Sequence, residues 1–443
     1  MARVREIETA GVVERYGALK AALPGAGRAW LDELRQAGLE AFAAAGLPGP
    51  KVEAWKYTGL NALKKLDLTA LAPAEAVATD TAPTLLADAA GPRLIFVNGH
   101  YRPELSRSAA LPEGVDVAAL SQRFDDGQVA ENLGRIADLA SSPLAALNTA
   151  LMQDGYVIRL AKEARIEAPI EILYLSLPGE HPSAAYPRNL IIAEAGSAAT
   201  ILEYHLGLGG TAYLANGVTE IRAGRGAELR HYKVQSEATE AFHIHQTTAE
   251  LAHEARLESF VLMLGARLAR NETRVALNGR EAACRVNGAY LLAGRQHGDN
   301  MTAIDHAAAD TTSRQVFKGV LDGNSRAVFH GKVLVRPGAR GTDGQQLNKT
   351  LLLSDKAEID SKPELEIHAD DVKCSHGATA GELAEDAVFY LRSRGLPEAE
   401  ARGLLVEAFL DEALAEVETA AVAETMRGLV QNWLRARRQG AVR

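Results

Sequence analysis

A cysteine and a histidine two residues apart are the side chains of this sequence best suited to metal or thiol chemistry. Cys374 and His376 lie in segment 362–381, where residues 364–370 alternate between apolar and polar as in a half-buried strand. If the strand resumes after Asp371, both side chains project from one face. Such a pair suits a transition metal. A buried cysteine beside a hydrogen-bonded histidine is the alternative, and the residue types alone do not decide between them.

Other histidines form weaker metal patterns. His243 and His245 have the same-face spacing of a metal pair on a strand, and His297 and His306 lie in another polar stretch. No carboxylate or third histidine stands beside them, so we interpret them as ordinary strand-face or coil-turn histidines. With two cysteines in the chain, a four-cysteine zinc site and an all-cysteine iron–sulfur cluster are excluded by count.

Motifs of self-sufficient enzymes are missing from the sequence. It contains neither a phosphate-binding Gly-x-x-x-x-Gly-Lys-Ser/Thr loop nor a Gly-x-Ser-x-Gly nucleophile motif. A cysteine and a histidine two apart on a strand do not point at each other, which disfavours acyl transfer. An enzyme acting on polysaccharide stays open as an alternative, with Asp299, Asp305 and Asp310 as candidate acids in an exposed cleft.

Length and composition limit the class of protein. A chain of 443 residues is too long for one ordinary compact core, which favours several domains or an elongated repeat. The formal charge of -9 disfavours nucleic-acid and anionic-membrane binding. The early charges, the absence of a long apolar run and the two cysteines predict an untargeted cytoplasmic protein.

The elements that must position these residues change character along the chain. Residues 1 to about 65 have helical patterns with a stop at Gly46, residues 68–91 resemble a loose connector, and residues 141–152 suit one more helix. A first β-rich run lies at 93–97. From residue 155 to 367 such short β-rich runs dominate, for example the one at 156–160.

Turn residues recur in this β-rich half at roughly 25 to 30 residues, which favours a stacked β-solenoid over a sandwich. Helical signals return after Gly381. We therefore predict three parts: a mostly helical N-terminal domain with a connector over 1–150, a parallel β-helix core over 151–378 and a helical C-terminal domain over 379–443.

Distinctive motifs lie along nearly the whole chain. The most specific is Asp370-Asp-Val-Lys-Cys-Ser-His-Gly-Ala-Thr379, followed by Phe389-Tyr-Leu-Arg-Ser-Arg-Gly395. The other motifs are at residues 53–58, 305–319, 322–331, 345–349 and 363–381. Together they resemble the SufD family of the iron–sulfur cluster assembly system called SUF, whereas the related SufB subunits carry more cysteines.

This resemblance implies a mainly β protein, with a right-handed parallel β-helix flanked by helical N-terminal and C-terminal domains. It implies a non-catalytic scaffold subunit that pairs with SufB through the β-helix edge, binds the SufC ATPase, and supports cluster assembly and iron acquisition. A purely structural homo-oligomer is a further alternative, and self-pairing of the isolated chain as a homodimer through the edge meant for SufB stays open.

The resemblance also implies roles for individual residues. His376, with Cys374 beside it, lies at the SufB interface and transiently holds an iron–sulfur cluster shared with that partner; the isolated chain is expected to bind none. The helical C-terminal domain contacts SufC, with candidate contacts at Phe389, Tyr390, Leu404 and Phe409.

Overall fold

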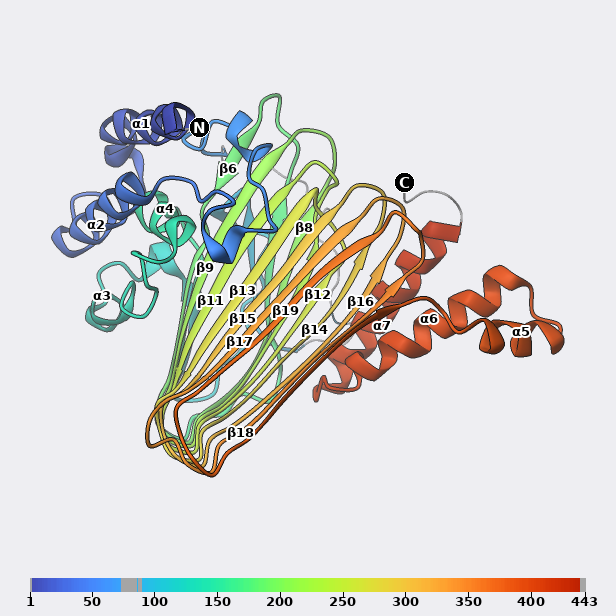
Figure 1. Cartoon of the computed structure of the whole chain (residues 1–443). Coiled ribbons are helices and arrows are strands. Elements are labelled where there is room, and N and C mark those ends of the chain that lie inside the picture. Colours follow the sequence, from blue (N-terminus) through green and yellow to red (C-terminus); the bar gives the residue numbers. More distant parts are fainter. Residues whose placement is uncertain (1, 73–85, 87–89, 439–443) are drawn as a thin grey trace.

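Parallel strands stacked into a solenoid dominate the computed structural model, which describes residues 2–72, 86 and 90–438. The solenoid has about eight turns between residues 157 and 381. Successive strands alternate between two sheets, so each turn adds one strand to each sheet. The predicted parallel β-helix with helical segments at both ends is confirmed (Figure 1).

The first sheet runs in the order β2-β1-β5-β8-β10-β12-β14-β16-β18-β20. Its strands are β1 (Arg93–Val97), β2 (His100–Tyr101), β5 (Ile170–Ser176), β8 (Ala198–Gly207), β10 (Glu228–Ser236), β12 (Arg256–Met263), β14 (Ala283–Leu292), β16 (Thr312–Leu321), β18 (Asp343–Leu352) and β20 (Lys373–Gly381).

The second sheet runs in the order β19-β17-β15-β13-β11-β9-β7-β4-β3, with β6 paired to β9. Its strands are β3 (Val115–Ala119), β4 (Tyr156–Leu160), β6 (Ser183–Ala185), β7 (Arg188–Ala193), β9 (Tyr213–Ala223), β11 (Phe242–Leu251), β13 (Leu268–Leu277), β15 (His297–His306), β17 (Arg326–Val335) and β19 (Glu358–Ile367).

Register explains why these sequences stack. Arg256, Ala283, Thr312, Asp343 and Lys373 are successive partners along the first sheet, so one turn takes 27 to 31 residues, close to the predicted repeat. Parallel partners point their side chains to the same side, and alternate residues therefore line the lumen between the two sheets. Because each turn covers the one before it, burial is nearly continuous until the last turn.

The N-terminal helices pack on the second sheet. They are α1 (Ala2–Leu19), α2 (Ala29–Ala45), α3 (Gly127–Asn132) and α4 (Pro143–Leu151), with short 3-10 turns at Lys20–Ala22, Glu53–Trp55, Leu63–Lys65 and Leu120–Gln122. Helix α2 ends at Gly46, where φ is 62°, a conformation that glycine adopts without strain. Helix α4 is buried along its whole length. The predicted connector at 68–91 lies mostly outside the described residues.

Helices α5 (Glu385–Ser393), α6 (Glu398–Leu414) and α7 (Ala420–Arg438) follow the last strand. An apolar cluster joins α6 and α7 to the outer face of the first sheet, and it includes Leu410, Met426 and Phe260. Helix α5 projects away from the solenoid (Figure 1). No helix in the part of the chain that the structure describes is long and apolar enough to cross a membrane.

Candidate functional site

Cys374 and His376 lie on β20, the outermost strand of the first sheet. The alternating residues predicted as a strand before them form the end of β19. Asp371 then takes a positive φ of 57°, and the chain becomes extended again as β20, as predicted. Strand β20 pairs with β18, and no described strand pairs with its other edge. The pair therefore sits at the open end of the solenoid.

His376 continues a row of buried lumen side chains. Its register partner is Gln346, whose own partner is Gln315, and these two glutamines are 3 % and 1 % exposed. His376 itself is exposed, because no further turn among the described residues covers the last strand. Cys374 is half-buried beside an apolar cluster that contains Val333 and Val335. An imidazole and a thiol thus face the lumen on a strand that no further described turn of the solenoid covers.

The two cysteines occupy one column of the first sheet. Register leads from Cys374 through Gly344 and Ser313 to Cys284. Three strand spacings correspond to roughly 14 Å, twice the reach of a disulfide, and both thiols are free. Burial raises the pKa of Cys284 to about 12, and partial burial also raises the pKa of Cys374.

Charged side chains surround the open end. Lys362, Glu364, Glu366 and His368 lie on or just after β19 and remain at least partly exposed. Hydrogen bonds from His368 and Lys332 lower the pKa of Glu366 to about 2. Charges along an edge strand oppose indiscriminate pairing with other sheets. This edge therefore suits a partner whose surface charges are complementary to these side chains.

A cluster of histidines with one carboxylate lies inside the solenoid. Glu203 and His205 come from β8, His231 from β10, and His243 and His245 from β11. All five are at most 2 % exposed, and we call them the lumen cluster. The premise that no carboxylate or third histidine lies beside His243 and His245 holds along the sequence but fails in space, because stacking adds residues from earlier turns.

Glu203 is the centre of the lumen cluster. Its Oε1 lies 2.9 Å from His231 Nε2, and its Oε2 lies 3.2 Å from His205 Nε2. Burial alone would raise the pKa of Glu203, but the charge of His231 and hydrogen bonds from His205 and His231 outweigh it and lower that pKa. Burial lowers the pKa of His205 to about 4 and holds the pKa of His245 well below its ordinary value. Both imidazoles are therefore neutral near neutral pH.

The other two histidines singled out in the sequence are structural. His306 places its ring nitrogens 2.8 Å from Thr311 Oγ1 and 2.8 Å from Ser313 Oγ. His297 Nε2 lies 3.0 Å from Thr58 Oγ1. Each is an ordinary hydrogen-bonded histidine, as the sequence predicts.

The three candidate acids of the polysaccharide alternative form no catalytic pair. Asp299 and Asp305 lie six residues apart on β15, which corresponds to roughly 20 Å, whereas glycosidase carboxylates stand about 5 to 9.5 Å apart. Asp310 lies in the loop between β15 and β16. Each acid instead forms an ion pair with an arginine, respectively Arg270, Arg336 and Arg280. The geometry does not support this alternative.

The segment around Trp55 fastens the N-terminal part to the solenoid. The Trp55 ring lies 4.0 Å from the guanidinium carbon of Arg270 on β13, in cation–π contact. Thr58 donates a hydrogen bond to Asp299 on β15, and Glu53 forms an ion pair with a lysine of β19. The motif at residues 53–58 therefore contacts three strands of the second sheet, β13, β15 and β19, and stabilises the solenoid turns that lead to the open end.

Three of the four candidate partner contacts on the C-terminal helices are exposed. Phe389 is 72 %, Tyr390 57 % and Leu404 42 % exposed, and Phe389 also lines a groove of about 540 Å³ at the turn between α5 and α6. Phe409 differs, because its ring packs towards the solenoid 4.4 Å from Lys318 Nζ. Phe409 thus supports α6, while the other three face outwards.

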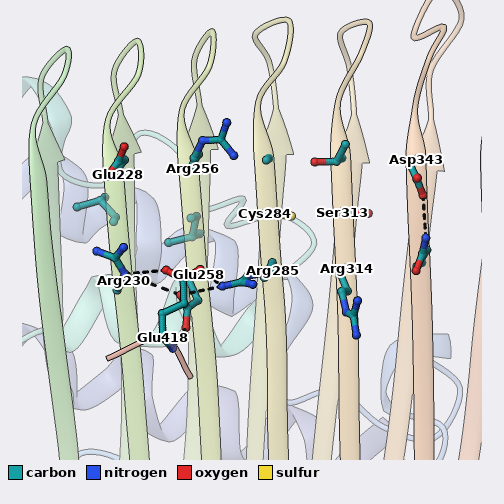
Figure 2. A pocket seen from close by; sticks show the side chains of 15 residues that line it. Glu228, Arg230, Arg256, Glu258, Cys284, Arg285, Ser313, Arg314, Asp343 and Glu418 are labelled. Carbon is teal, nitrogen blue, oxygen red and sulfur yellow. Dashed lines mark hydrogen bonds and ion pairs between the residues drawn. The ribbon is translucent and has the colours of Figure 1, made fainter. Parts of the chain in front are cut away.

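A second groove, of about 500 Å³, lies where the first sheet meets the turn between α6 and α7 (Figure 2). Arg230, Arg285 and Arg314 project into it from β10, β14 and β16 of the first sheet. Glu418 forms ion pairs with Arg230 and Arg285, and Glu258 contacts the same two arginines. The groove is a charge-balanced junction that orients the C-terminal helices, and no sequence pattern predicts it because its parts are nearly 190 residues apart.

Comparison with known proteins covers nearly the whole chain. Residues 176–409 match the family model described as SUF system FeS cluster assembly, SufBD core domain, and residues 12–172 match the SufBD protein N-terminal region.

Individual relatives agree with the family models. An iron–sulfur cluster assembly SufBD family protein of Synechocystis sp. is 34 % identical over 409 residues, 89 % of each chain. The iron–sulfur cluster assembly protein SufD of Escherichia coli is 32 % identical over 369 residues, 83 % of this chain and 84 % of that protein. The chloroplastic protein ABCI7 of Arabidopsis thaliana is 26 % identical over 91 % of this chain and 86 % of its own. The resemblance predicted from the motifs is confirmed: the chain belongs to the SufBD family of SUF-system iron–sulfur cluster assembly proteins.

Proposed function

We propose that this protein is the SufD-type scaffold subunit of a cytoplasmic SUF complex, without catalysis of its own. It pairs with SufB through the open end of the solenoid and binds the SufC ATPase through the C-terminal helices. The nascent iron–sulfur cluster is its cargo, shared with SufB. The observation that carries the proposal is the placement of Cys374 and His376 at a lumen position that no further turn covers.

The chemistry of this position suits a shared site. An imidazole supplies one ligand for iron, and a thiol that deprotonates near the metal supplies a second. Two ligands do not complete a cluster, so the partner must supply the rest. The unpaired edge of β20 offers backbone hydrogen bonds to a partner strand, which would bring the partner's ligands to the same place. The uncovered edge thus supports both the pairing and the shared cluster.

Replacement of His376 tests the proposal in the complex. The protein is co-expressed with SufB and SufC as wild type and as His376→Ala, and iron and acid-labile sulfide are measured in the purified complex. We expect about a tenfold or greater loss of both, because a ligand of the nascent cluster is removed.

The matched control is His368→Ala, which removes an exposed histidine from the same end of the solenoid, bonded to Glu366. It should leave loading unchanged. Unchanged loading in His376→Ala, with the complex intact, would remove His376 from the proposed site.

Size measurements separate the scaffold from a structural homo-oligomer. The isolated chain is expected to self-associate weakly through the open edge and to exchange its partner for SufB when SufB and SufC are added. A homo-oligomer that persists unchanged in the presence of both proteins would favour the structural alternative.

A further inference from the structure

We propose that the lumen cluster is a binding site for a divalent transition-metal ion, held inside this chain and separate from the open-end pair of Cys374 and His376. The ligands are Glu203, His205 and His245. The proposal concerns the isolated chain and does not depend on any partner.

The geometry of the three ligands is compact. One donor atom from each of Glu203, His205 and His245 lies within 4.8 Å of the others. The donors of a tetrahedral site stand roughly 3.3 Å apart for bonds of 2.0–2.1 Å, so modest side-chain movements bring them onto one ion. The rings of His205 and His245 are 5.5 Å apart and nearly perpendicular, at 81°. Neither ring stacks face to face over the other and blocks the space between them.

Orphaned imidazole nitrogens are the second observation. His243 Nε2 and His245 Nδ1 are buried and have no hydrogen-bond partner within the described ranges. A buried polar network that serves structure alone is normally fully paired, and each exception requires an explanation. Gly217 on β9 is the register partner of His245 on β11, and a Cβ at Gly217 would collide with Nδ1 of the His245 ring. The absence of a side chain at Gly217 leaves room for this ring.

Charge around the cluster favours a cation. Glu203 and Glu237 are two buried carboxylates, and the buried Lys233, whose charge acts on Glu203, His205 and His245, offsets only one of them. His243 Nδ1 lies 2.8 Å from Glu237 Oε2, which places the second carboxylate beside the lumen cluster.

The donor set selects the class of ion. Two imidazoles and one carboxylate suit zinc or ferrous iron, and the set has no thiolate to favour copper(I). Calcium and magnesium prefer all-oxygen sites. His231, bonded to Glu203 Oε1, fixes the carboxylate's orientation without taking the second oxygen. The site therefore fits a borderline first-row divalent ion.

Metal analysis of the full-length chain tests the site. The protein is purified without chelator and its metals are measured by mass spectrometry; the bound ion is then removed with a chelator, and Co²⁺ is added to the apo-protein as a spectroscopic probe that zinc displaces. We expect about one tightly held ion per chain, with the Co²⁺ spectrum of nitrogen and oxygen ligands and no thiolate charge-transfer band. His245→Gln and Glu203→Gln should each weaken binding about 100-fold or more.

Two control variants locate the ion. His306→Gln removes another buried lumen histidine whose nitrogens are both hydrogen-bonded, and it should keep the metal. The double variant Cys374→Ser/His376→Ala removes the open-end pair and should also keep the metal. Circular dichroism confirms that each variant is folded. Should His245→Gln fail to fold, Glu203→Gln and the Co²⁺ spectrum of the wild type decide.

Three results would overturn the site: no bound ion in the wild type before or after metal addition, binding unaffected by His245→Gln and Glu203→Gln, or binding lost in the open-end double variant. The first result would assign the cluster to hydrogen bonding with water. The first two results leave cluster loading in the complex untouched, and the third would assign the ion to the open-end pair, so failure of this site and failure of the proposed function are distinguishable.

Discussion

At the scale of single residues, position in the stack decides what each side chain is able to do. Cys284 and Cys374 share a column of the first sheet, yet Cys284 lies beneath three further strands of that sheet and Cys374 lies on the last strand. Cys284 is 2 % exposed, whereas Cys374 is half-buried. A thiol reacts as its thiolate and only where a reagent reaches it. The two cysteines should therefore differ sharply in reactivity.

A thiol titration checks this difference. In the folded protein at pH 8, a disulfide reagent should modify one thiol quickly and the second at least about tenfold more slowly, because burial raises the pKa of Cys284 to about 12. Cys374→Ser should abolish the fast phase, and Cys284→Ser should leave it. Two fast thiols in the native protein would show that the interior is open to the reagent.

At the scale of elements, close stacking restricts the strands to certain residues. Gly319 on β16 lies directly opposite Tyr290 on β14, and a Cβ there would overlap the tyrosine ring. The Tyr290 hydroxyl is held by Asn348 at 3.0 Å and Thr350 at 2.7 Å. The ring thus has no easy route of escape, and the glycine fills a packing requirement that its sequence context does not reveal.

Gly319→Ala should lower the free energy of unfolding by about 1–3 kcal/mol, as overpacking of a well-filled core does. Chemical denaturation measures it. Gly381→Ala is the matched control, since this glycine ends β20 and a Cβ there meets nothing within 4 Å. Equal stability of the two variants would contradict the tight stacking of β14 and β16.

At the scale of the whole molecule, the last strand leads into two different surfaces. The open end carries Cys374 and His376 on β20, while α5, which follows β20 in the chain, projects away from the solenoid (Figure 1) and exposes Phe389 and Tyr390. Large apolar side chains that stand exposed together on a monomer favour a protein partner. Under the proposed function, that partner is SufC.

The variant Phe389→Ala/Tyr390→Ala should therefore weaken SufC binding by at least about tenfold, because exposed aromatic residues dominate such interfaces. Calorimetry or pull-down with purified SufC measures the loss. Leu208→Ala, which trims another large apolar residue that is 40 % exposed, should have no effect. Undiminished binding by the double variant would place the SufC contact elsewhere on this chain.

The sequence by itself determined the repeating β-rich runs, the helical ends and the placement of Cys374 and His376 on one face of the last strand. These depend on local alternation, turn residues and short motifs, which are legible over a few neighbours. Strands such as Arg93–Val97 and Tyr156–Leu160 appear where the runs predict them. The family resemblance rests on the same short-range information.

Only the tertiary structure decided which residues from different turns meet. Glu203 and His245 are 42 positions apart in sequence, and only the register of β8, β10 and β11, with the face on which each strand points inwards, brings them within reach of one ion. A shift of one residue in any strand would turn its lumen side chains outwards. The exposure of His376 was likewise decided by the end of the stack, because the same row of residues is buried wherever another turn follows.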